Sequence, residues 1–259
     1  MLKFYKNDEE RFNEIKKVKK KVAKSLNISP DDKVLDVLVG YGDFSREAAK
    51  SSRANVFAIE INMEDMKEAI KRIKEEKLED KVKIIRMDAA NMGFRDETFD
   101  WVINFIGWED LTAFSGIEGV ENVFKEMVRV LKKNGNISIV FIPQIEGRDY
   151  ISKFDREIEE FIWVSENRRF FFKREFFENL FKEYNIEIIK IKTFKTHKDR
   201  MIPEDGLGKL KWTYDNYKSF YPEAEMRDFD EVIKKYGDFI KKYGMKEERS
   251  NFTLIVGRK

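Results

Sequence analysis

The sequence predicts an α/β fold in which a doubly wound, mostly parallel sheet carries helices on both faces. From residue 33 onward, short apolar runs alternate with segments of helical periodicity, and this alternation predicts βαβ units. The apolar runs are continuous rather than alternating, which is typical of parallel strands buried on both faces. The chain has 259 residues, of which 42% are hydrophobic, so it is large enough for one α/β domain with an appendage.

The N-terminal part predicts an amphipathic helix over Asp8 to Leu26, where apolar residues recur at helical spacing and Lys and Glu fill the other faces. Strands and helices then follow in turn. In chain order, we expect a strand at 34–39, a helix at 44–51, a strand at 55–61, a helix at 63–77, strands at 82–87 and 98–106, a helix at 117–131 and a strand at 136–143.

The regular alternation ends after Pro143. A helix is expected at 173–184, a strand at 186–194 and a final strand at 251–258. About fifty residues separate those two strands, too many for a simple turn, and they predict an insertion with a helix at Phe229–Tyr243. We therefore expect an N-terminal helix in residues 1–29, a main domain in 30–196 and 250–259, and a cap or subdomain in 197–249.

The composition excludes several kinds of site. The chain contains no Cys, which excludes disulfides, a thiolate nucleophile and Cys-ligated zinc, and its single histidine, His197, excludes a site built on two of them. We expect no bound metal. The net charge of +2 argues against a uniformly basic nucleic-acid binder, so nucleic acid is not the favoured partner.

The basic run KKVKKK at 16–21 admits two interpretations, a patch for RNA or membrane and a solvated helix face, and the second is favoured. No run approaches the roughly 18 apolar residues of a membrane span, and the N-terminus lacks the apolar core of a secretory signal. We expect a cytoplasmic protein without a membrane partner. Its Lys- and Glu-rich composition is in part that of a thermophile protein.

Polar or glycine residues stand at the carboxyl ends of four predicted strands. In VLDVLVGYGDF, Gly40 and Gly42 follow the first strand and form a turn that lets a nucleotide approach the backbone. Glu60 ends the second strand, where a carboxylate accepts hydrogen bonds from ribose hydroxyls. Asp88 ends the third strand and Asn104 the fourth. Taken singly, each fits an ordinary turn or a surface acid, but such ends meet at one edge of a parallel sheet and together predict a nucleotide site.

With these motifs the chain resembles the class I, S-adenosylmethionine-dependent methyltransferases with a seven-stranded Rossmann-like sheet. The matching stretches are VLDVLVGYGDF, VFAIEIN, RMDAANMGFRDETFDWVI and VFKEMVRVLKKNGNISIVF, within residues 30–142. In the family motif D/E-x-G-x-G-x-G, the acid corresponds to Asp36 and the last two glycines to Gly40 and Gly42. Leu38 stands in place of the first glycine. The resemblance implies S-adenosylmethionine as cofactor and an antiparallel seventh strand inserted beside the fifth.

The expected cofactor contacts come from residues at these strand ends. Asp88 is expected to accept from the adenine amino group, and the adjacent backbone N–H to donate to a ring nitrogen. Leu38 either lies in extended backbone at little cost, or constrains φ and crowds the methionine end of the cofactor. The full set of expected cofactor-binding residues is Asp36, Leu38, Gly40, Gly42, Glu60, Ile61, Asp88, Ala89, Asn104 and Phe105.

Methyl transfer is an in-line displacement that needs positioning and exclusion of water, and it needs a base only if the acceptor loses a proton. The catalytic residue stays open between two weak candidates: Glu109, which also fits an N-cap or a solvent-facing acid, and His197, which also fits a structural histidine. Trp108 either walls the acceptor pocket or packs in the core. Trp212 and Tyr214 of the aromatic segment 210–226 either line that pocket or form the core of the insertion.

We expect a small molecule as methyl acceptor. The chain lacks the N/D-P-P-Y/W signature that often accompanies amino methylation of nucleic acids, and it lacks the Cys of pyrimidine C5 methylation. An RNA or protein methyltransferase and a non-catalytic S-adenosylmethionine-binding protein remain as alternatives. A dinucleotide-dependent dehydrogenase fits less well, because GYGDFS places Ser45 at the third small position of G-x-G-x-x-G and the Asp88–Ala89 strand end has no role there.

Overall fold

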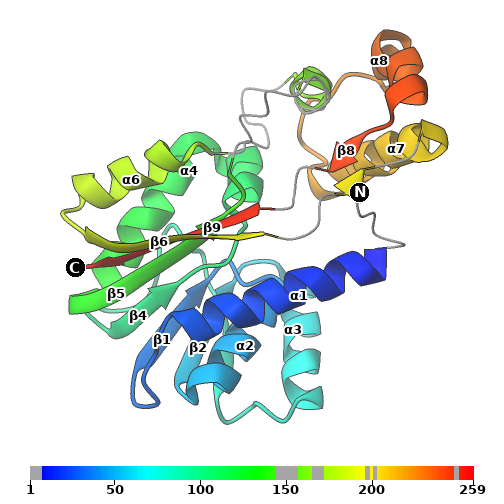
Figure 1. Cartoon of the computed structure of the whole chain (residues 1–259). Helices are drawn as coiled ribbons and strands as arrows, with labels where there is room; N and C mark the ends of the chain where they lie inside the picture. The colour runs from blue at the N-terminus through cyan, green and yellow to red at the C-terminus, as the bar shows by residue number, and fades with distance from the viewer. Residues whose placement is uncertain (1–7, 144–156, 165–171, 196–198, 201–202, 248–250) are drawn as a thin grey trace.

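Figure 1 shows the computed structural model, which describes residues 8–143, 157–164, 172–195, 199–200, 203–247 and 251–259. Its centre is a seven-stranded sheet with the order β3-β2-β1-β4-β5-β9-β6, and this confirms the predicted α/β class. The strands are β1 (Lys33–Val37), β2 (Asn55–Glu60), β3 (Val82–Arg86), β4 (Phe99–Ile103), β5 (Leu131–Phe141), β6 (Glu187–Lys195) and β9 (Asn251–Arg258).

Within this sheet, β9 alone runs antiparallel to its neighbours. It lies between β5 and β6, and its Ile255 pairs with Ile139 on one side and with Ile191 on the other. The remaining neighbours, from β3 through β5, pair in parallel. The antiparallel last strand is therefore confirmed. The strand order reverses between β1 and β4, and in open α/β sheets ligands bind at the carboxyl ends of strands at such a reversal.

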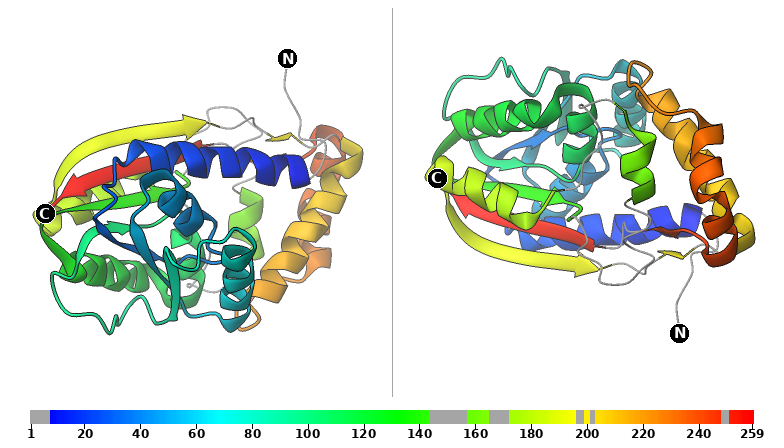
Figure 2. Two further views of the ribbon diagram at one scale, coloured as in Figure 1. Left: turned by 90° about the horizontal axis from the view of Figure 1, so that it is seen from below. Right: turned by 90° about the horizontal axis from the view of Figure 1, so that it is seen from above.

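Helices cover both faces of the sheet (Figure 2). The first face carries α1 (Asp8–Ser25), α2 (Asp43–Ser52) and α3 (Met63–Glu75), and the second carries α4 (Trp108–Val130) and α6 (Arg174–Glu183). Each face has its own apolar core. Val22, Phe44 and Ile73 from the three helices pack on the first face, and Phe124 and Phe181 pack on the second.

α4 is longer than its sequence pattern indicates. The pattern predicts a helix only at 117–131, whereas α4 begins at Trp108, directly after Gly107 with φ +99. Its first part runs to Gly116, whose φ of +64 and ψ of −166 bend the helix. Glycine is about 1 kcal/mol less favourable than alanine inside a helix, so the glycines around this bend conceal the helical pattern. The bend separates a short helix at the end of β4 from the longer part that covers the sheet.

Between β6 and β9 the chain forms a small helical part. We call this part, taken together with the helical segment 157–162, the cap. Its elements are β7 (Asp199–Arg200), α7 (Pro203–Phe220), α8 (Phe229–Tyr243) and β8 (Lys246–Glu247). In Figure 1 the cap lies on the side toward which the parallel strands point. Its core consists of Ile158, Ile162, Trp163, Leu210, Tyr214, Tyr217, Tyr221, Val232, Tyr236, Ile240 and Met245, with Ala113 of α4 packed among them.

α7 is absent from the sequence-based expectation, because its glycines and aromatic residues have lower helix propensity than alanine or leucine. Leu210, Tyr214 and Tyr217 nevertheless follow each other at helical spacing, and all three are buried in the cap core. The aromatic segment therefore supplies a core, which is one of the two interpretations of its sequence.

The expectations about His197, a membrane span and a bound metal can be compared only with the residues that the structure describes. His197 lies outside the described residues. In the part of the chain that the structure describes, no helix combines the length and the apolar character needed to cross a bilayer. Nor does any group of three His, Asp or Glu side chains in these ranges stand close enough together to hold a metal ion.

Candidate cofactor and acceptor site

The glycine turn between β1 and α2 lies at the carboxyl ends of the strands. Gly40 has φ +50 and Gly42 has φ +67, a region in which glycine has no steric cost. A Cβ on Gly42 would lie 3.3 Å from the Cβ of Ala69 on α3, whereas a Cβ on Gly40 would meet no atom within 4 Å. Gly42 therefore permits close packing against α3, and Gly40 leaves open space beside the backbone.

Leu38 takes the left-handed backbone conformation that the glycine it replaces would favour. β1 ends at Val37, and Leu38 has φ +60. The interpretation in which Leu38 extends the strand at little cost is therefore wrong, since a residue with a Cβ costs about 1–2 kcal/mol in this region. Its half-buried side chain faces the start of α4, where a Cβ on Gly107 would lie 3.5 Å from the Leu38 Cβ.

Replacing Leu38 with glycine and, separately, with alanine isolates this backbone strain. Both variants lose the packing of the leucine side chain, but only glycine relieves the strain, so we expect Leu38→Gly to be more stable than Leu38→Ala by about 1 kcal/mol. At Val39, which is not among the residues with positive φ, the order should reverse. Chemical denaturation of the four variants measures both differences. Equal stability of the two Leu38 variants would show that the leucine is unstrained.

Glu60 joins the end of β2 to the glycine turn. Its Oε2 accepts a hydrogen bond from the Gly40 N–H at 2.8 Å, and its Oε1 accepts from the N–H groups of Ile61 at 2.9 Å and Asn62 at 3.0 Å. Backbone donors therefore hold both oxygens at the strand ends. An ionised carboxylate has about four acceptor positions, so capacity for a ribose hydroxyl remains beside these three bonds.

Asp88 and Ala89 follow β3 and offer an acceptor and a donor. Asp88 is exposed, and its Oδ1 accepts from the Ala90 N–H at 2.8 Å, which fixes the carboxylate in a turn. The described residues provide no acceptor for the Ala89 N–H. Ile61, directly after Glu60, is 56% exposed. Together these groups match the needs of an adenine ring, which are an acceptor for its amino group, a donor to a ring nitrogen and an apolar contact.

Asp36 lies on β1 beneath the turn and is 1% exposed. Its Oδ2 accepts a hydrogen bond from the Ser45 Oγ of α2 at 2.6 Å. Burial raises the pKa of Asp36 to about 7, even though this hydrogen bond and the charge of Lys19 oppose the shift. A direct contact between Asp36 and the cofactor stays a prediction. In the structure, Asp36 is a buried acceptor that positions the start of α2.

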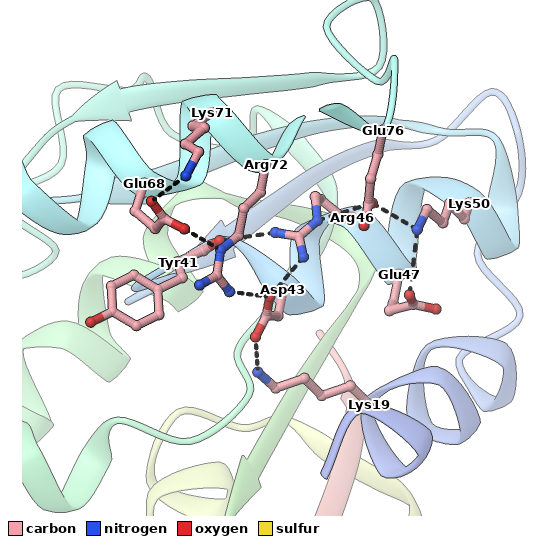
Figure 3. Close-up of polar contacts among 10 residues, drawn as sticks. All are labelled: Lys19, Tyr41, Asp43, Arg46, Glu47, Lys50, Glu68, Lys71, Arg72 and Glu76. Atoms are coloured by element: carbon pink, nitrogen blue, oxygen red, sulfur yellow. Dashed lines mark hydrogen bonds and ion pairs between the residues drawn. The ribbon is translucent and has the colours of Figure 1, made fainter. Parts of the chain in front are cut away.

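A network of ion pairs holds the glycine turn from outside (Figure 3). Asp43, the residue after Gly42, pairs with Lys19 of α1 at 3.0 Å, with Arg46 at 2.7 Å and with Arg72 of α3 at 3.2 Å. Burial by itself would raise the pKa of Asp43, but the charges and hydrogen bonds of Lys19 and Arg46 outweigh it and lower the pKa to about 2. Asp43 therefore connects three helices at the base of the turn.

The same arginines also hold the peptide inside the turn. Arg46 donates to the backbone carbonyl of Tyr41 at 3.0 Å, and the Arg72 guanidinium lies 4.9 Å from the centre of the Tyr41 ring. Sequence reasoning missed this network. The one indication in the sequence was the position of Asp43 directly after the glycine turn. The sequence does not indicate which distant Lys and Arg side chains form ion pairs with it.

Asn104 and Phe105 lie at the end of β4 and are buried. The Asn104 Nδ2 donates to the carbonyl of Val37 at 2.9 Å and to that of Ile106 at 2.8 Å, which joins the ends of β1 and β4. Among the described residues, its buried Oδ1 has no hydrogen-bond partner. The ring of Phe105 packs on Phe44 in the core, so its backbone, rather than its side chain, faces the strand ends.

The first part of α4 joins the main domain to the cap. Trp108 is fully buried and its ring lies 5.3 Å from that of Phe177, so its side chain takes a core position rather than the wall of an open pocket. Two residues further on, the Asp110 Oδ1 accepts from the hydroxyl of Tyr221 in the cap at 2.6 Å. Phe114 is 63% exposed, and its ring lies 5.0 Å from that of Tyr221.

The remaining candidates do not share one surface. Glu109 is 2% exposed in the first turn of α4, whose N-cap is Gly107, so it is neither the cap nor a solvent-facing acid, and its role as a base stays a prediction. Tyr214 is buried in the cap core, and its hydroxyl donates to the carbonyl of Arg227 at 2.9 Å. Trp212, also on α7, is 47% exposed.

The residues present fit the adenosine part of S-adenosylmethionine. Glu60, Asp88 and the Ala89 N–H retain hydrogen-bonding capacity at neighbouring strand ends. The space beside Gly40 is open. The buried Oδ1 of Asn104 adds an acceptor without a partner in the described structure at the same edge.

The chain is similar in sequence and in fold to known methyltransferases. Residues 35–139 match the family model described as a methyltransferase domain. The chain is 36% identical over 112 residues to sterol methyltransferase-like 3 of Botryococcus braunii, covering 43% of this chain and 27% of that protein. It is 24% identical over 192 residues to the demethylmenaquinone methyltransferase of a Geobacillus species, covering 66% of this chain and 77% of that protein. In fold it is similar to a methyltransferase of Methanosarcina mazei, with a TM-score of 0.60, 16% identity and coverage of 91% and 95% of the two chains.

The matched region contains the expected strand-end residues from Asp36 to Asn104. The chain spans about a quarter of the Botryococcus protein and about three-quarters of the Geobacillus one. At 16% identity, the likeness to the Methanosarcina structure concerns the fold alone. S-adenosylmethionine is the cofactor of this domain family. Residues 35–139 therefore form a methyltransferase domain, with the fold of the class I, Rossmann-like, S-adenosylmethionine-dependent methyltransferases.

Proposed function

We propose that the protein transfers a methyl group from S-adenosylmethionine to an apolar small molecule. The observation that carries the acceptor class is the exposure of large apolar side chains on the segments that follow β1 and β4, where Tyr41 is 46% and Phe114 63% exposed. Apolar exposure next to a ligand site favours an apolar ligand. Relatives named as demethylmenaquinone and sterol 24-C-methyltransferases support this acceptor class.

When bound, S-adenosylmethionine supplies a methyl group attached to a positively charged sulfur. The chain's own part is to hold the adenosine through Glu60 and Asp88 and to exclude water at the strand ends. The hydrogen bond between Asp110 and Tyr221 closes the seam between α4 and the cap, which limits entry of water on that side. For an acceptor that must lose a proton, Glu109 at the start of α4 is the base.

Incubation with methyl-tritiated S-adenosylmethionine and a heat-inactivated whole-cell extract, which contains lipids, aqueous metabolites, RNA and protein, tests this proposal. After phase separation, we expect label in the organic phase with the wild-type protein and background label with Glu60→Ala. Label in acid-precipitated RNA or protein would instead assign the macromolecular alternative. Retention of the cofactor with no label in any fraction, including an aqueous metabolite extract, would assign the non-catalytic alternative.

A further inference from the structure

Two lysine-rich stretches without acidic residues lie side by side. Residues 15–27, in α1 and the turn after it, contain six lysines and no Asp or Glu, and residues 188–195, in β6, contain three lysines and no Asp or Glu. Over the whole chain, 51 basic residues stand against 49 acidic ones, so this segregation is local. The stretches touch, since the Lys190 Nζ donates to the Ser25 carbonyl at 2.6 Å. Figure 2 shows α1 and β6 along the same side of the molecule.

Most of these lysines carry charge that no acid balances. The exposed ones without an acidic partner, which we call the basic face, are Lys16, Lys20, Lys21 and Lys24 of α1 with Lys192 of β6, whose pairing with Leu254 places it on the α1 side of the sheet. In the described part of the chain, none of the five forms an ion pair. Two other lysines of α1 differ, because Lys17 pairs with Glu14 at 2.7 Å and Lys19 turns inward to Asp43 at 3.0 Å.

The apolar residue exposed among these lysines is aliphatic. Ile189 is 46% exposed on β6, which is the edge strand of the sheet, whereas the exposed Ile191 pairs with Ile255 and lies on the other face. A hollow of about 330 Å³, lined among others by Ser25, Ile189 and Lys190, opens between β6 and the end of α1. Surfaces for single-stranded nucleic acid present exposed aromatic rings for base stacking, whereas the one aromatic residue of β6, Phe194, is buried.

We propose that the basic face docks the protein on an anionic phospholipid membrane. Clusters of about four to eight lysines on an amphipathic helix are attracted to anionic headgroups, each lysine strengthening binding roughly fivefold. Lysines at four-residue spacing, Lys16, Lys20 and Lys24, reach the surface together, and the aliphatic side chain of Ile189 enters the headgroup region beside them. The basic face shares no residue with the strand-end site, so this docking does not depend on the identity of the methyl acceptor.

Co-sedimentation with vesicles tests the proposal directly. We expect the wild-type chain to bind vesicles of phosphatidylcholine with phosphatidylglycerol and not to bind vesicles of phosphatidylcholine alone. Its affinity for the anionic vesicles should fall steeply as the salt concentration rises. The variant Lys20→Glu/Lys21→Glu/Lys24→Glu should bind the anionic vesicles at least about 100-fold more weakly. A matched control with the same change in net charge replaces the exposed Lys74, Lys125 and Lys234, on α3, α4 and α8, with Glu.

The outcomes separate docking from a general effect of charge. We expect the control to lose affinity less than about fivefold, and we expect both variants to keep the wild-type melting temperature and affinity for S-adenosylmethionine. Equal losses in the two variants would overturn the proposal, as would the absence of binding to anionic vesicles. Tighter, salt-sensitive binding of bulk tRNA that is lost in the α1 variant would assign the face to nucleic acid instead.

Discussion

Replacing Glu60 with alanine is expected to weaken the binding of S-adenosylmethionine by about 100-fold, since a hydrogen bond to a charged group contributes about 1.5–3 kcal/mol and the carboxylate retains capacity for a ribose hydroxyl. A second effect acts in the same direction. The Oε2 of Glu60 lies 2.8 Å from the Gly40 nitrogen, so the variant also releases the glycine turn. Isothermal titration with S-adenosylmethionine measures the change in the dissociation constant.

Two further variants bracket this effect. Glu60→Gln keeps one oxygen acceptor, so it retains the backbone bonds on only one side and loses the charge, and we expect a loss of affinity of at least about tenfold. Glu64→Ala removes an exposed acid one turn further on, which pairs only with Lys67 in the described structure, at 2.7 Å, and we expect no change in affinity. Binding of Glu60→Ala within about threefold of wild type would show that the acid does not hold the ribose.

The elements of the main sheet were predictable because their signal is local. Continuous apolar runs mark buried parallel strands wherever they occur. The first four such runs here end in a glycine, acid or amide, and Glu60 and Asp88 lie at the strand ends as expected. The antiparallel position of β9 is different, since no pattern within its eight residues specifies its neighbours. That position followed from the family resemblance.

What the sequence could not reveal depends on contacts between distant segments. Leu38 has a left-handed backbone because the chain packed around it, including Gly107, imposes this conformation. The residues next to Leu38 in the sequence do not predict it. Asp43 meets Lys19, 24 residues away, and Arg72, 29 residues away, and neither separation has a periodic signature. α7 was missed for the same reason, because packing in the cap core overrides its low helix propensity.

The free energy of unfolding is expected to fall as the pH rises from about 4 to about 7, and Asp36 is the cause. Its pKa is about 7 in the folded protein, against an ordinary value of 3.8. In this window the unfolded chain has released the proton while the folded chain still holds it, so each pH unit lowers the free energy of unfolding by up to about 1.4 kcal/mol, or at most about 4 kcal/mol in total.

Asp43 contributes in a separate window and with the opposite sign. Its folded pKa of about 2 lies below its ordinary value of 3.8, so its stabilisation is complete above that value and is lost as the pH falls toward 2. The two acids can therefore be measured independently in one series of urea titrations from pH 2 to pH 8. Asp43→Asn should lower the stability at pH 7 by roughly 2 kcal/mol and leave it unchanged near pH 2.

Asp36→Asn should abolish the decline between pH 4 and pH 7. The amide oxygen still accepts from the Ser45 Oγ, so the variant is expected to match the wild type near pH 4, where Asp36 is protonated in the folded protein. Above pH 7 the wild type must bury a charge that asparagine lacks, and the variant should then be more stable by up to a few kcal/mol. Parallel curves for the two proteins would mean that Asp36 ionises normally in the fold. Its charge would then be balanced by Lys19, and the glycine turn would rest on a buried ion pair rather than on a neutral acid.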